Sequence, residues 1–320
     1  MAYGQEAALS SGNPQVVGLG YCAWDYVGRV SDLPDFDSPT LDLSELVSSG
    51  GGPVATALVA LARLGVRTGY IGAVGDDEPG LRIRAAFEEE GVDLRRLRPQ
   101  SNTRSPVCLV LVQAGTGRRA ILCYRGNGTD IVLRDKDRTY LTSAQILHLD
   151  AHHLQVAITA AQWMRQSGRS VVLDANKPRP RLGELLTWTD VLITNSSFPE
   201  EYTGKRDLEQ AASLLLQEGP RLVVSTLGEQ GCSCFTRDCG FHVAGFSLPV
   251  IDTTGAGDAF HGGFIFGLLQ EWSLRRTAEF ANAVAALNCT ALGGRTALPD
   301  LSQAYELLRS TGAWDDHKAR

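Results

Sequence analysis

The residues from Ile251 to Phe260 combine small and acidic side chains in a pattern that could bind an anion and move a proton beside it. Gly255 and Gly257 leave backbone N–H groups uncovered and allow positive φ angles, so these groups can converge where a helix begins. Such a terminus carries roughly half a positive charge and several unpaired N–H donors, which favours a bound anion. Asp258 places a carboxylate beside this site, where it repels a phosphate, so we expect it to have a chemical task. The obvious task is to remove a proton from the hydroxyl that attacks the phosphate. The structural alternative is capping, because Asp is common in first helical turns.

The string from Asp252 to Phe260, D-T-T-G-A-G-D-A-F, resembles the signature of the ribokinase-like (PfkB) family of sugar and nucleoside kinases at every position. The resemblance implies ATP-dependent phosphorylation of a primary hydroxyl on a sugar or sugar derivative, with Mg²⁺ bridging the ATP phosphates. Asp258 would then act as the general base. The backbone N–H groups of Gly255, Ala256 and Gly257 would stabilise negative charge on the transferred group.

Earlier segments resemble the family's sugar-binding residues, and the similarity as a whole extends over residues 16–310. Gly51 and Gly52, at the start of a predicted helix, match the di-glycine signature through which the backbone approaches sugar hydroxyls. Asp25 matches the aspartate that accepts hydrogen bonds from the substrate, with a turn carboxylate as the structural alternative. Thr56 occupies a helix position where the family usually has Asn, so we expect its smaller hydroxyl to alter the sugar contacts.

Positions in the second half of the chain resemble the family's nucleotide-binding segments. They are expected near the ATP phosphates, along the ATP crevice and near adenine, and they are Asn176, Asn195, Thr226, Gly228, Gly231 and Asn282. The family's N-x-x-E motif, which is linked to Mg²⁺ through water, reads Asn195-Ser196-Ser197-Phe198 here. Phe198 cannot take that role, so either Glu200 or Glu201 replaces the glutamate, or the metal rests on phosphates and water.

The resemblance also implies a monovalent cation beside the anion-binding turn. Many family members hold K⁺ at positions that match Asp252 and Thr254, together with backbone carbonyls from the loop near residues 290–296. A cation at this place would order the turn.

The segments 51–53, 260–262 and 293–300 are together most similar to the sulfofructose kinase branch of the family. His261 replaces the Asn that usually follows the Phe, and we expect it to be structural. Residues 30–45 contain no lysine to match the one that binds the substrate headgroup in that branch. The reaction type of the branch is therefore implied, whereas its sulfosugar substrate is not.

Two other functions stay open. The acceptor could be a nucleoside or a ketodeoxy sugar acid, or the chain could bind sugar or nucleotide as a non-catalytic regulator. The intact Asp258 argues against a regulator, while Phe198 leaves it open. A Walker-type phosphate loop is excluded because the sequence contains no G-x4-G-K-S/T, and Gly18-Leu19-Gly20 lacks the third glycine of a dinucleotide fingerprint.

Alternating apolar segments predict an α/β fold of the ribokinase-like type, with a mostly parallel central sheet and helices on both faces. We expect strands at 16–20, 68–74, 146–149, 171–174, 191–194, 222–226 and 246–251, and helices at 53–64, 80–90, 155–167, 207–218, 258–270, 274–291 and 300–309. Polar or glycine residues follow several of these strands, at the sheet edge where ligands bind in open α/β sheets.

Two further segments, at about 22–50 and 105–130, are predicted to form a small β-sheet lid over the substrate, the second as a hairpin of strands 107–112 and 120–124. An exposed lid sheet leaves apolar surface and free edges, so we expect a homodimer formed through the lid. The kinase domain is assigned to residues 16–320, and residues 1–15 to a flexible tail.

Composition narrows the range of partners. The chain has 320 residues, 43% of them hydrophobic, and a formal net charge of −6. Its arginine pairs at 95–96, 118–119 and 275–276 are short, are predicted to be ordinary surface, and form no stripe for nucleic acid. No run of about 18 apolar residues indicates a membrane span, and the N-terminus lacks the pattern of a signal peptide.

The seven cysteines indicate a reducing compartment. They are odd in number and scattered, and their one cluster, Cys232, Cys234 and Cys239, lacks the C-x2-C spacing of zinc sites. We expect reduced cysteines on neighbouring strands and a cytosolic protein.

Overall fold

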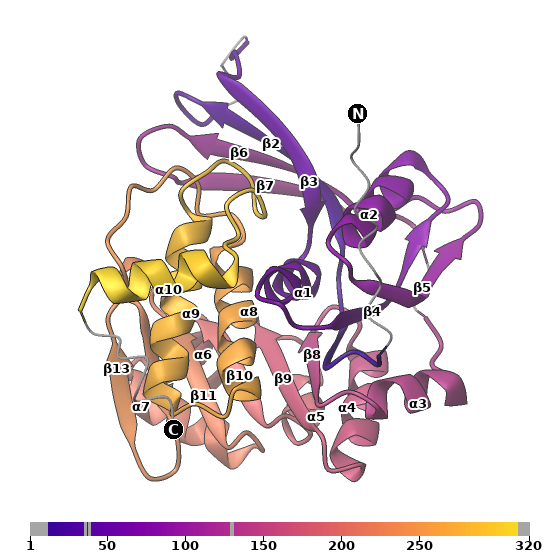
Figure 1. The fold of residues 1–320 in the computed structure, drawn as a ribbon, viewed down its shortest axis with the longest axis vertical. Coiled ribbons are helices and arrows are strands. Elements are labelled where there is room, and N and C mark those ends of the chain that lie inside the picture. Colours follow the sequence, from indigo (N-terminus) through magenta and orange to yellow (C-terminus); the bar gives the residue numbers. More distant parts are fainter. Residues whose placement is uncertain (1–11, 35–36, 38–39, 129–130, 313–320) are drawn as a thin grey trace.

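The computed structural model describes residues 12–34, 37, 40–128 and 131–312, arranged around two β-sheets (Figure 1). The larger sheet has, in spatial order, the strands β13 (Gly240–Val243), β12 (Cys232–Phe235), β11 (Leu222–Thr226), β10 (Val191–Asn195), β9 (Ser170–Ala175), β8 (Ile146–Asp150), β1 (Val16–Leu19), β4 (Thr68–Gly75) and β5 (Asp93–Gln100). From β11 to β5 the neighbours pair in parallel, while β12 and β13 add an antiparallel edge. The predicted mostly parallel sheet is confirmed.

Helices cover both faces of this sheet and create two separate cores. They are α1 (Pro53–Arg63), α2 (Glu78–Glu89), α3 (Asp135–Thr142), α4 (Leu154–Gln166), α5 (Leu182–Leu186), α6 (Phe198–Thr203), α7 (Leu208–Gln217), α8 (Ala256–Leu269), α9 (Leu274–Asn288) and α10 (Leu301–Ser310). Successive side chains of a strand point to opposite faces. Along β9, Val172 therefore packs into the core under α1, α2 and α8–α10, while Val171 and Leu173 pack into the core under α3–α7.

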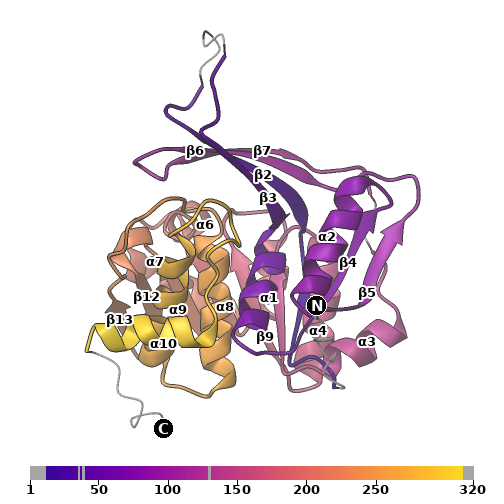
Figure 2. The same ribbon diagram turned by 45° about the horizontal axis from the view of Figure 1, so that its top comes forward.

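The smaller sheet has the order β3 (Glu45–Gly51), β2 (Ala23–Val30), β6 (Val107–Gln113) and β7 (Arg119–Tyr124). It extends across the top of the molecule, above the larger sheet and its helices (Figure 2). Its inner face forms a third apolar cluster that includes Ala23, Val27 and Val110. Its outer face carries exposed apolar side chains, because the register places Leu109 opposite Leu122.

One predicted strand is wrong. Residues 246–251 have no regular structure and run from β13 toward α8 as an extended connection. Pro249 has no N–H to donate to a ladder, and Val250 is 50% exposed, so the segment lacks both the hydrogen bonds and the burial of a central strand. It is held instead at its end, where the Ile251 N–H donates to the carbonyl of Cys289 at 2.9 Å.

Several short elements were not predicted. The edge strand β5 has the sequence DLRRLRPQ, whose charges hide the strand pattern, and α3, α5 and α6 are helices of no more than eight residues. Helix α8 begins at Ala256, two residues before the predicted start at 258. The predicted tail at 1–15 lies outside the described residues as far as residue 11, and the Gln15 N–H donates to the carbonyl of Arg67 at 2.8 Å.

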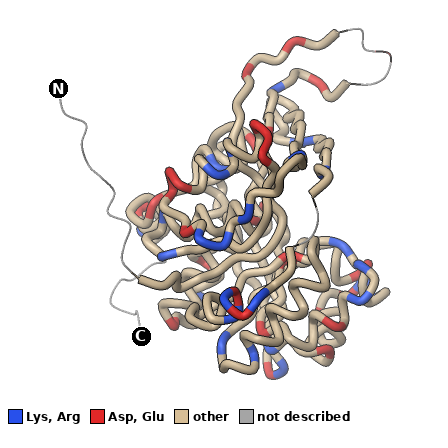
Figure 3. The backbone as a smooth tube through the Cα atoms, turned by 90° about the vertical axis from the view of Figure 1, so that its right-hand side faces the viewer, with Lys and Arg blue, Asp and Glu red and all other residues tan. Residues whose placement is uncertain are grey.

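Charged residues of both signs are interspersed along the chain on the side seen in Figure 3. Searched over its described residues, the chain has no helix that is both long and apolar enough to cross a bilayer. All seven cysteines are free thiols, as predicted, with Cys232 and Cys234 on β12 and Cys239 just before β13.

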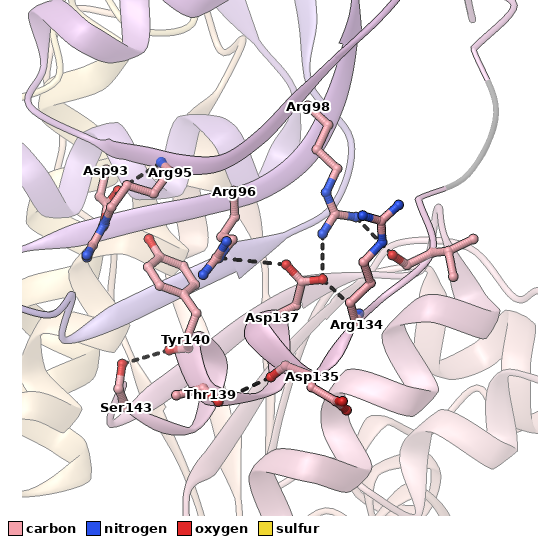
Figure 4. A network of polar contacts seen from close by, with 11 residues as sticks. Asp93, Arg95, Arg96, Arg98, Arg134, Asp135, Asp137, Thr139, Tyr140 and Ser143 are labelled. Carbon is pink, nitrogen blue, oxygen red and sulfur yellow. Dashed lines mark hydrogen bonds and ion pairs between the residues drawn. The ribbon is translucent and has the colours of Figure 1, made fainter.

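A buried carboxylate fastens the edge strand β5 to helix α3 (Figure 4). Asp137 has no exposed surface, accepts a hydrogen bond from the Arg134 N–H at 2.8 Å, and lies 2.5 Å from Nη2 of Arg98 and 3.8 Å from Nε of Arg96. Tyr140 adds a second contact, because the guanidiniums of Arg95 and Arg96 lie over its ring. Arg96, whose side chain is 23% exposed, is therefore bound to α3 and is not ordinary surface, whereas Arg95 is 59% exposed, as predicted.

We predict that Asp137→Ala lowers the free energy of unfolding by about 2–3 kcal/mol. The loss stays below that of a fully buried pair because the two arginine partners are 23% and 27% exposed. Urea denaturation measures the change. The matched control is Glu88→Ala, which removes an exposed pair with Arg84 and should cost less than about 0.5 kcal/mol. Equal losses in the two variants would contradict this role of Asp137.

Candidate active site

The turn before α8 is shaped by a glycine that no other residue can replace. Gly255 is the N-cap of α8 with φ 74° and ψ 0°, and a Cβ there would lie 2.4 Å from the carbonyl oxygen of Gly294. Gly257, in the first helical turn, is exposed, and a Cβ on it would meet no atom within 4 Å. The N–H of Ala256, the first residue of the helix, donates back to the carbonyl of Thr253 at 3.2 Å, whereas the open space around Gly257 leaves room for an anion beside the first turn. The open turn agrees with an anion site, which stays a prediction.

Asp258 is the third residue of α8 and is partly buried beside this turn. Burial raises the pKa of its carboxyl to about 6. The charges of Arg119 and Arg295 oppose the rise, and those of Asp25 and Asp150 add to it. Two arginines and two further carboxylates therefore surround the predicted base.

Asp25, on β2, presents a carboxylate oxygen that has no partner among the described residues. Its side chain is 8% exposed and lies against Gly51, where a Cβ would be 1.9 Å from Oδ2. Its Oδ1 is buried without a hydrogen bond, and burial raises the pKa of the carboxyl to about 6, opposed mainly by Arg295. A buried acceptor without a donor is costly unless a ligand supplies one. A substrate hydroxyl fits this place.

The di-glycine segment is shaped by close backbone contacts as well. Gly52 has φ 100°, and a Cβ on it would lie 2.3 Å from the carbonyl oxygen of Tyr21. Gly51 accepts a hydrogen bond at its carbonyl from Nη2 of Arg295 at 3.2 Å. At both glycines a side chain would clash with neighbouring atoms, so the predicted sugar site requires glycine at these two positions.

Arg295 joins the two predicted halves of the substrate site, and its role was missed in the sequence. It is 6% exposed and its Nε donates to Oγ1 of Thr56 at 3.1 Å. Burial lowers its pKa to about 10, opposed first by Asp25, so it stays charged at neutral pH. Thr56, 1% exposed, supports this guanidinium, which differs from the expected contact of its hydroxyl with the sugar. The one sequence signal that could have found Arg295 is that it lies in the segment 293–300, which resembles the sulfofructose kinase branch.

Arg119 is a second residue that was missed. It lies on β7 of the smaller sheet, and its Nη1 donates a hydrogen bond to Oγ1 of Thr253, which donates in turn to the carbonyl of Gly117 at 3.2 Å. The prediction that the pair Arg118–Arg119 is ordinary surface was therefore wrong for Arg119. The contact joins residues 134 positions apart, which no local pattern can reveal.

Buried histidines lie beneath the catalytic turn. His261 is 3% exposed, stacks on His148 at 5.1 Å, and has Nε2 3.6 Å from Oδ1 of Asp174. Burial lowers the pKa of His261 well below its usual value, and burial with the nearby Asp258 raises that of Asp174. Both shifts favour the neutral forms of His261 and Asp174, and the burial of His261 agrees with the structural role that was expected.

The predicted nucleotide residues meet at three neighbouring strand ends. The Asn195 N–H donates to Oδ1 of Asn176 at 3.1 Å, and Oγ1 of Thr226 donates to the carbonyl of Thr194 at 3.1 Å. The loop after β11 turns at two glycines with positive φ, Gly228 and Gly231. Asn282 was expected near adenine, but its amide NH₂ is already engaged: it donates to the carbonyls of Val243 at 3.2 Å and Ala244 at 3.1 Å. These two hydrogen bonds fix the end of β13 and the residue that follows it.

The position of the missing glutamate belongs to the core. Phe198 is fully buried and stacks on Tyr202 at 5.4 Å, while its N–H donates to Oδ1 of Asn195 at 2.9 Å. Glu200 and Glu201 are both exposed, and Glu200 pairs with Arg206 at 3.4 Å. That one of these glutamates replaces the missing side chain stays a prediction, as does the alternative in which the metal rests on phosphates and water.

Behind the turn, buried oxygens lie where a cation is expected. Asp252 is fully buried, and its carboxylate accepts hydrogen bonds from the N–H groups of Thr254 at 2.8 Å and Gly293 at 2.9 Å. Oγ1 of Thr254 and Oδ1 of Asn288 are buried and lack hydrogen-bond partners in the described structure. The described residues contain no group of three or more His, Cys, Asp or Glu placed to hold a metal. The oxygens present suit a hard cation bound by hydroxyl, amide and backbone groups.

A comparison with protein families decides the identity of this fold and site. The family described as pfkB family carbohydrate kinase matches residues 13–301. The chain belongs to this family. It is thus an ATP-dependent carbohydrate kinase with a ribokinase-like α/β fold, which confirms the family resemblance, the fold class and the reaction type expected from the sequence.

Individual relatives of this pfkB kinase are moderately similar over almost their whole length. It is 29% identical to a ribokinase from Haemophilus influenzae and 32% identical to an ATP-dependent ribose-1-phosphate kinase from Halopiger xanaduensis, in both cases over 88% of this chain and 94% of the relative. The structure of Arabidopsis thaliana ribokinase complexed with ribose and ATP superposes with a TM-score of 0.81 at 25% identity, covering 93% of this chain and 99% of that one.

Proposed function

We propose that this kinase transfers the γ-phosphoryl group of ATP to a primary hydroxyl of a sugar or sugar derivative, with Asp258 as the general base. One observation carries the proposal: a carboxyl with a raised pKa lies in the first turn of a helix whose N-terminus is open to an anion. Beside it, Asp25 offers a buried oxygen that lacks a donor among the described residues. The electrostatic effect of Asp25 on Asp258 supports the proposal that the base and the group that accepts a hydrogen bond from the sugar belong to one site.

The reaction follows from these positions. The acceptor oxygen forms a bond to the γ-phosphorus, the bond from that phosphorus to the β–γ bridging oxygen breaks, and ADP leaves with the electron pair. The hydroxyl proton passes to Asp258. The N–H groups of Gly255, Ala256 and Gly257 stabilise charge on the transferred group. A positioned base contributes roughly 10²–10⁴-fold, or about 3–5 kcal/mol of the barrier.

The nucleotide is assigned to the strand-end crevice. Asn176 and Asn195 lie where the phosphates are expected, Thr226 with the Gly228–Gly231 loop forms the wall, and Asn282 shapes the wall near adenine by fixing residues 243–244. Mg²⁺ bound with ATP would neutralise its phosphates. Because Phe198 is buried, the protein supplies no glutamate at the N-x-x-E position, so the ion would rest on phosphate and water oxygens.

The smaller sheet, with residues 22–50 and 105–130, is assigned as a lid over the acceptor. It carries Asp25 on its inner face, and Arg119 connects it to the catalytic turn through Thr253. A lid that closes on the sugar excludes water, which otherwise competes as the phosphoryl acceptor.

We also assign K⁺ to the oxygens behind the turn. Asp252 supplies negative charge, and the unpartnered oxygens of Thr254 and Asn288 supply ligands. Since Asp252 already holds the N–H groups of Thr254 and Gly293, an ion there would order the turn that binds the phosphoryl group.

The outer face of the lid supports a homodimer. Leu46, Leu109, Leu122 and Tyr124 share this face by strand register and are 60%, 52%, 58% and 50% exposed. An apolar face of this kind marks an interaction surface, and pairing with a second copy would bury it. The free thiols, in turn, support the cytosol as the compartment.

We predict that Asp258→Asn lowers kcat about 10²–10⁴-fold while leaving the KM for ATP nearly unchanged. Coupled ADP release with a panel of sugars measures both quantities, and the panel includes a nucleoside and a ketodeoxy acid. In the wild type, kcat/KM should rise tenfold per pH unit up to about pH 6 and then level off, because the base must be deprotonated.

The Asn variant should lack this break in its pH profile. Undiminished turnover in the variant would remove Asp258 from its role as base. ATP binding by the wild type without turnover of any acceptor would favour the regulatory alternative instead.

We predict that replacing K⁺ by tetramethylammonium lowers kcat/KM on the order of tenfold, equivalent to about 1.4 kcal/mol of transition-state stabilisation. Thr254→Val, which keeps the shape but removes the ligand oxygen, should raise the K⁺ concentration needed for half-maximal activity. Equal rates with the two cations would rule out the K⁺ site.

We predict that Leu109→Glu converts a dimer to a monomer, because it places a charge in the centre of the apolar lid face. Light scattering after gel filtration measures the mass. Leu214→Glu is the matched control, since Leu214 on α7 is also partly exposed (37%) but lies outside the lid. A monomeric wild type at micromolar concentration would refute the dimer.

A further inference from the structure

A cavity lies at the sheet edge where the parallel strands end, and no step of the proposed reaction uses it. It has a volume of about 340 Å³, within the range of small-molecule sites. Its walls come from residues 70–75 of β4, from the ends of β1 and β5, from the segments that follow β1, β7, β8 and β9, and from the residues before β6. Those segments are far apart in the sequence and meet only here.

The described lining of this cavity is strongly basic. It contains Arg104, Arg125, Arg179, His152 and His153, and it contains no Asp or Glu. Within the described part of the chain, none of the three arginine side chains forms an ion pair with a carboxylate. Three arginines line one cavity whose described lining holds no carboxylate, and their like charges repel each other, so an anion would stabilise them.

The arginines are held in position by the surrounding structure. The guanidinium of Arg125 lies over the ring of Tyr21 at 5.2 Å, and this ring stacks on His152 at 5.0 Å. The backbone of Arg104 is fixed by Asn127, whose Oδ1 accepts from its N–H at 2.6 Å. The carbonyl of Arg179 accepts from the N–H of Leu182 at 3.2 Å. The cluster is thus built onto ordered segments.

The cavity lies on the acceptor side of the reaction centre. Along the sheet, the predicted nucleotide residues follow β9, β10 and β11, whereas the cavity is centred on the ends of β8, β1 and β4. Tyr21 and Cys22 of its wall lead directly into β2, which carries Asp25. Asp150 connects the two places, since it accepts a hydrogen bond from the Tyr21 N–H at 2.8 Å and acts electrostatically on Asp258.

We propose that the acceptor of this kinase is a sugar that already carries a tetrahedral oxyanion, a phosphate ester or a sulfonate, and that Arg104, Arg125 and Arg179 bind this group. The inference rests on the proposed function and specifies its substrate class. Arginine suits this task because its planar fork matches the oxygens of such anions with paired hydrogen bonds. The anion in the cavity would hold the sugar so that its far hydroxyl lies at Asp258.

The first experiment compares each neutral sugar with its own anionic derivatives. Fructose is paired with fructose 6-phosphate, fructose 1-phosphate and 6-deoxy-6-sulfofructose, ribose with ribose 1-phosphate, and a ketodeoxy acid tests a carboxylate. We expect kcat/KM for one phosphate ester or sulfonate to exceed that of its neutral parent at least about tenfold. The sulfonate arm separates the two tetrahedral anions.

The second experiment removes the arginines one at a time. Arg104→Gln, Arg125→Gln and Arg179→Gln should each raise the KM of the anionic acceptor about 10- to 100-fold while leaving the KM for ATP unchanged. Arg→Lys at the same positions should recover part of the loss. Arg84→Gln is the matched control, because Arg84 is an exposed arginine on α2 outside the cavity.

A binding measurement separates this inference from the proposed function. Calorimetry with the sugar phosphates is done on the Asp258→Asn protein, which needs no turnover. If no acceptor is phosphorylated but an ester binds and needs the arginines, the proposed function fails and the anion site stands. The inference is overturned if the neutral sugars are phosphorylated or bound with the same efficiency as their anionic derivatives. It is also overturned if the Gln variants weaken the binding of neutral and anionic sugars equally.

Discussion

The buried guanidinium of Arg295 allows the acidic groups of this site to exist close together. Burial raises the pKa of both Asp25 and Asp258, and the charge of Asp25 raises that of Asp258 further. Two carboxylates in such surroundings would both be protonated at neutral pH without a nearby positive charge. Arg295 provides that charge from a loop after α9, and it also holds the di-glycine segment through the Gly51 carbonyl. The electrostatics and the shape of the substrate site therefore depend on the same side chain.

The topology of the sheet separates the two substrates. Parallel strands deliver all their carboxyl ends to one edge, so the edge is long enough for a nucleotide at β9–β11 and a second ligand at β8–β1–β4. The proposed base, Asp258, lies at the start of a helix that packs on α1 and α9. Only the γ-phosphoryl group has to reach this point from the nucleotide side, which suits a reaction controlled by position and charge.

The smaller sheet has two different faces because strand residues alternate. Its inner face carries Asp25 and the apolar cluster that includes Val27 and Val110, while its outer face carries Leu109 and Leu122. The same four strands thus carry the proposed acceptor-binding residue on one face and an apolar surface on the other. Its contact with the catalytic turn, through Arg119, connects the lid to the chemistry.

The local sequence by itself determined the glycine turn that begins α8 and most of the parallel sheet, and it led to the predictions that Asp258 is the base and that Asp25 and the di-glycine segment bind sugar. Each of these is encoded by neighbours in the chain: a Gly that must adopt positive φ, an Asp in the first helical turn, an apolar run of strand length. Only the tertiary structure decided the roles of Arg295 and Arg119, the burial of Phe198, the failure of the strand at 246–251 and the basic cavity. These features depend on contacts between residues more than a hundred positions apart, or on which segments have a strand beside them. A local sequence pattern contains neither kind of information.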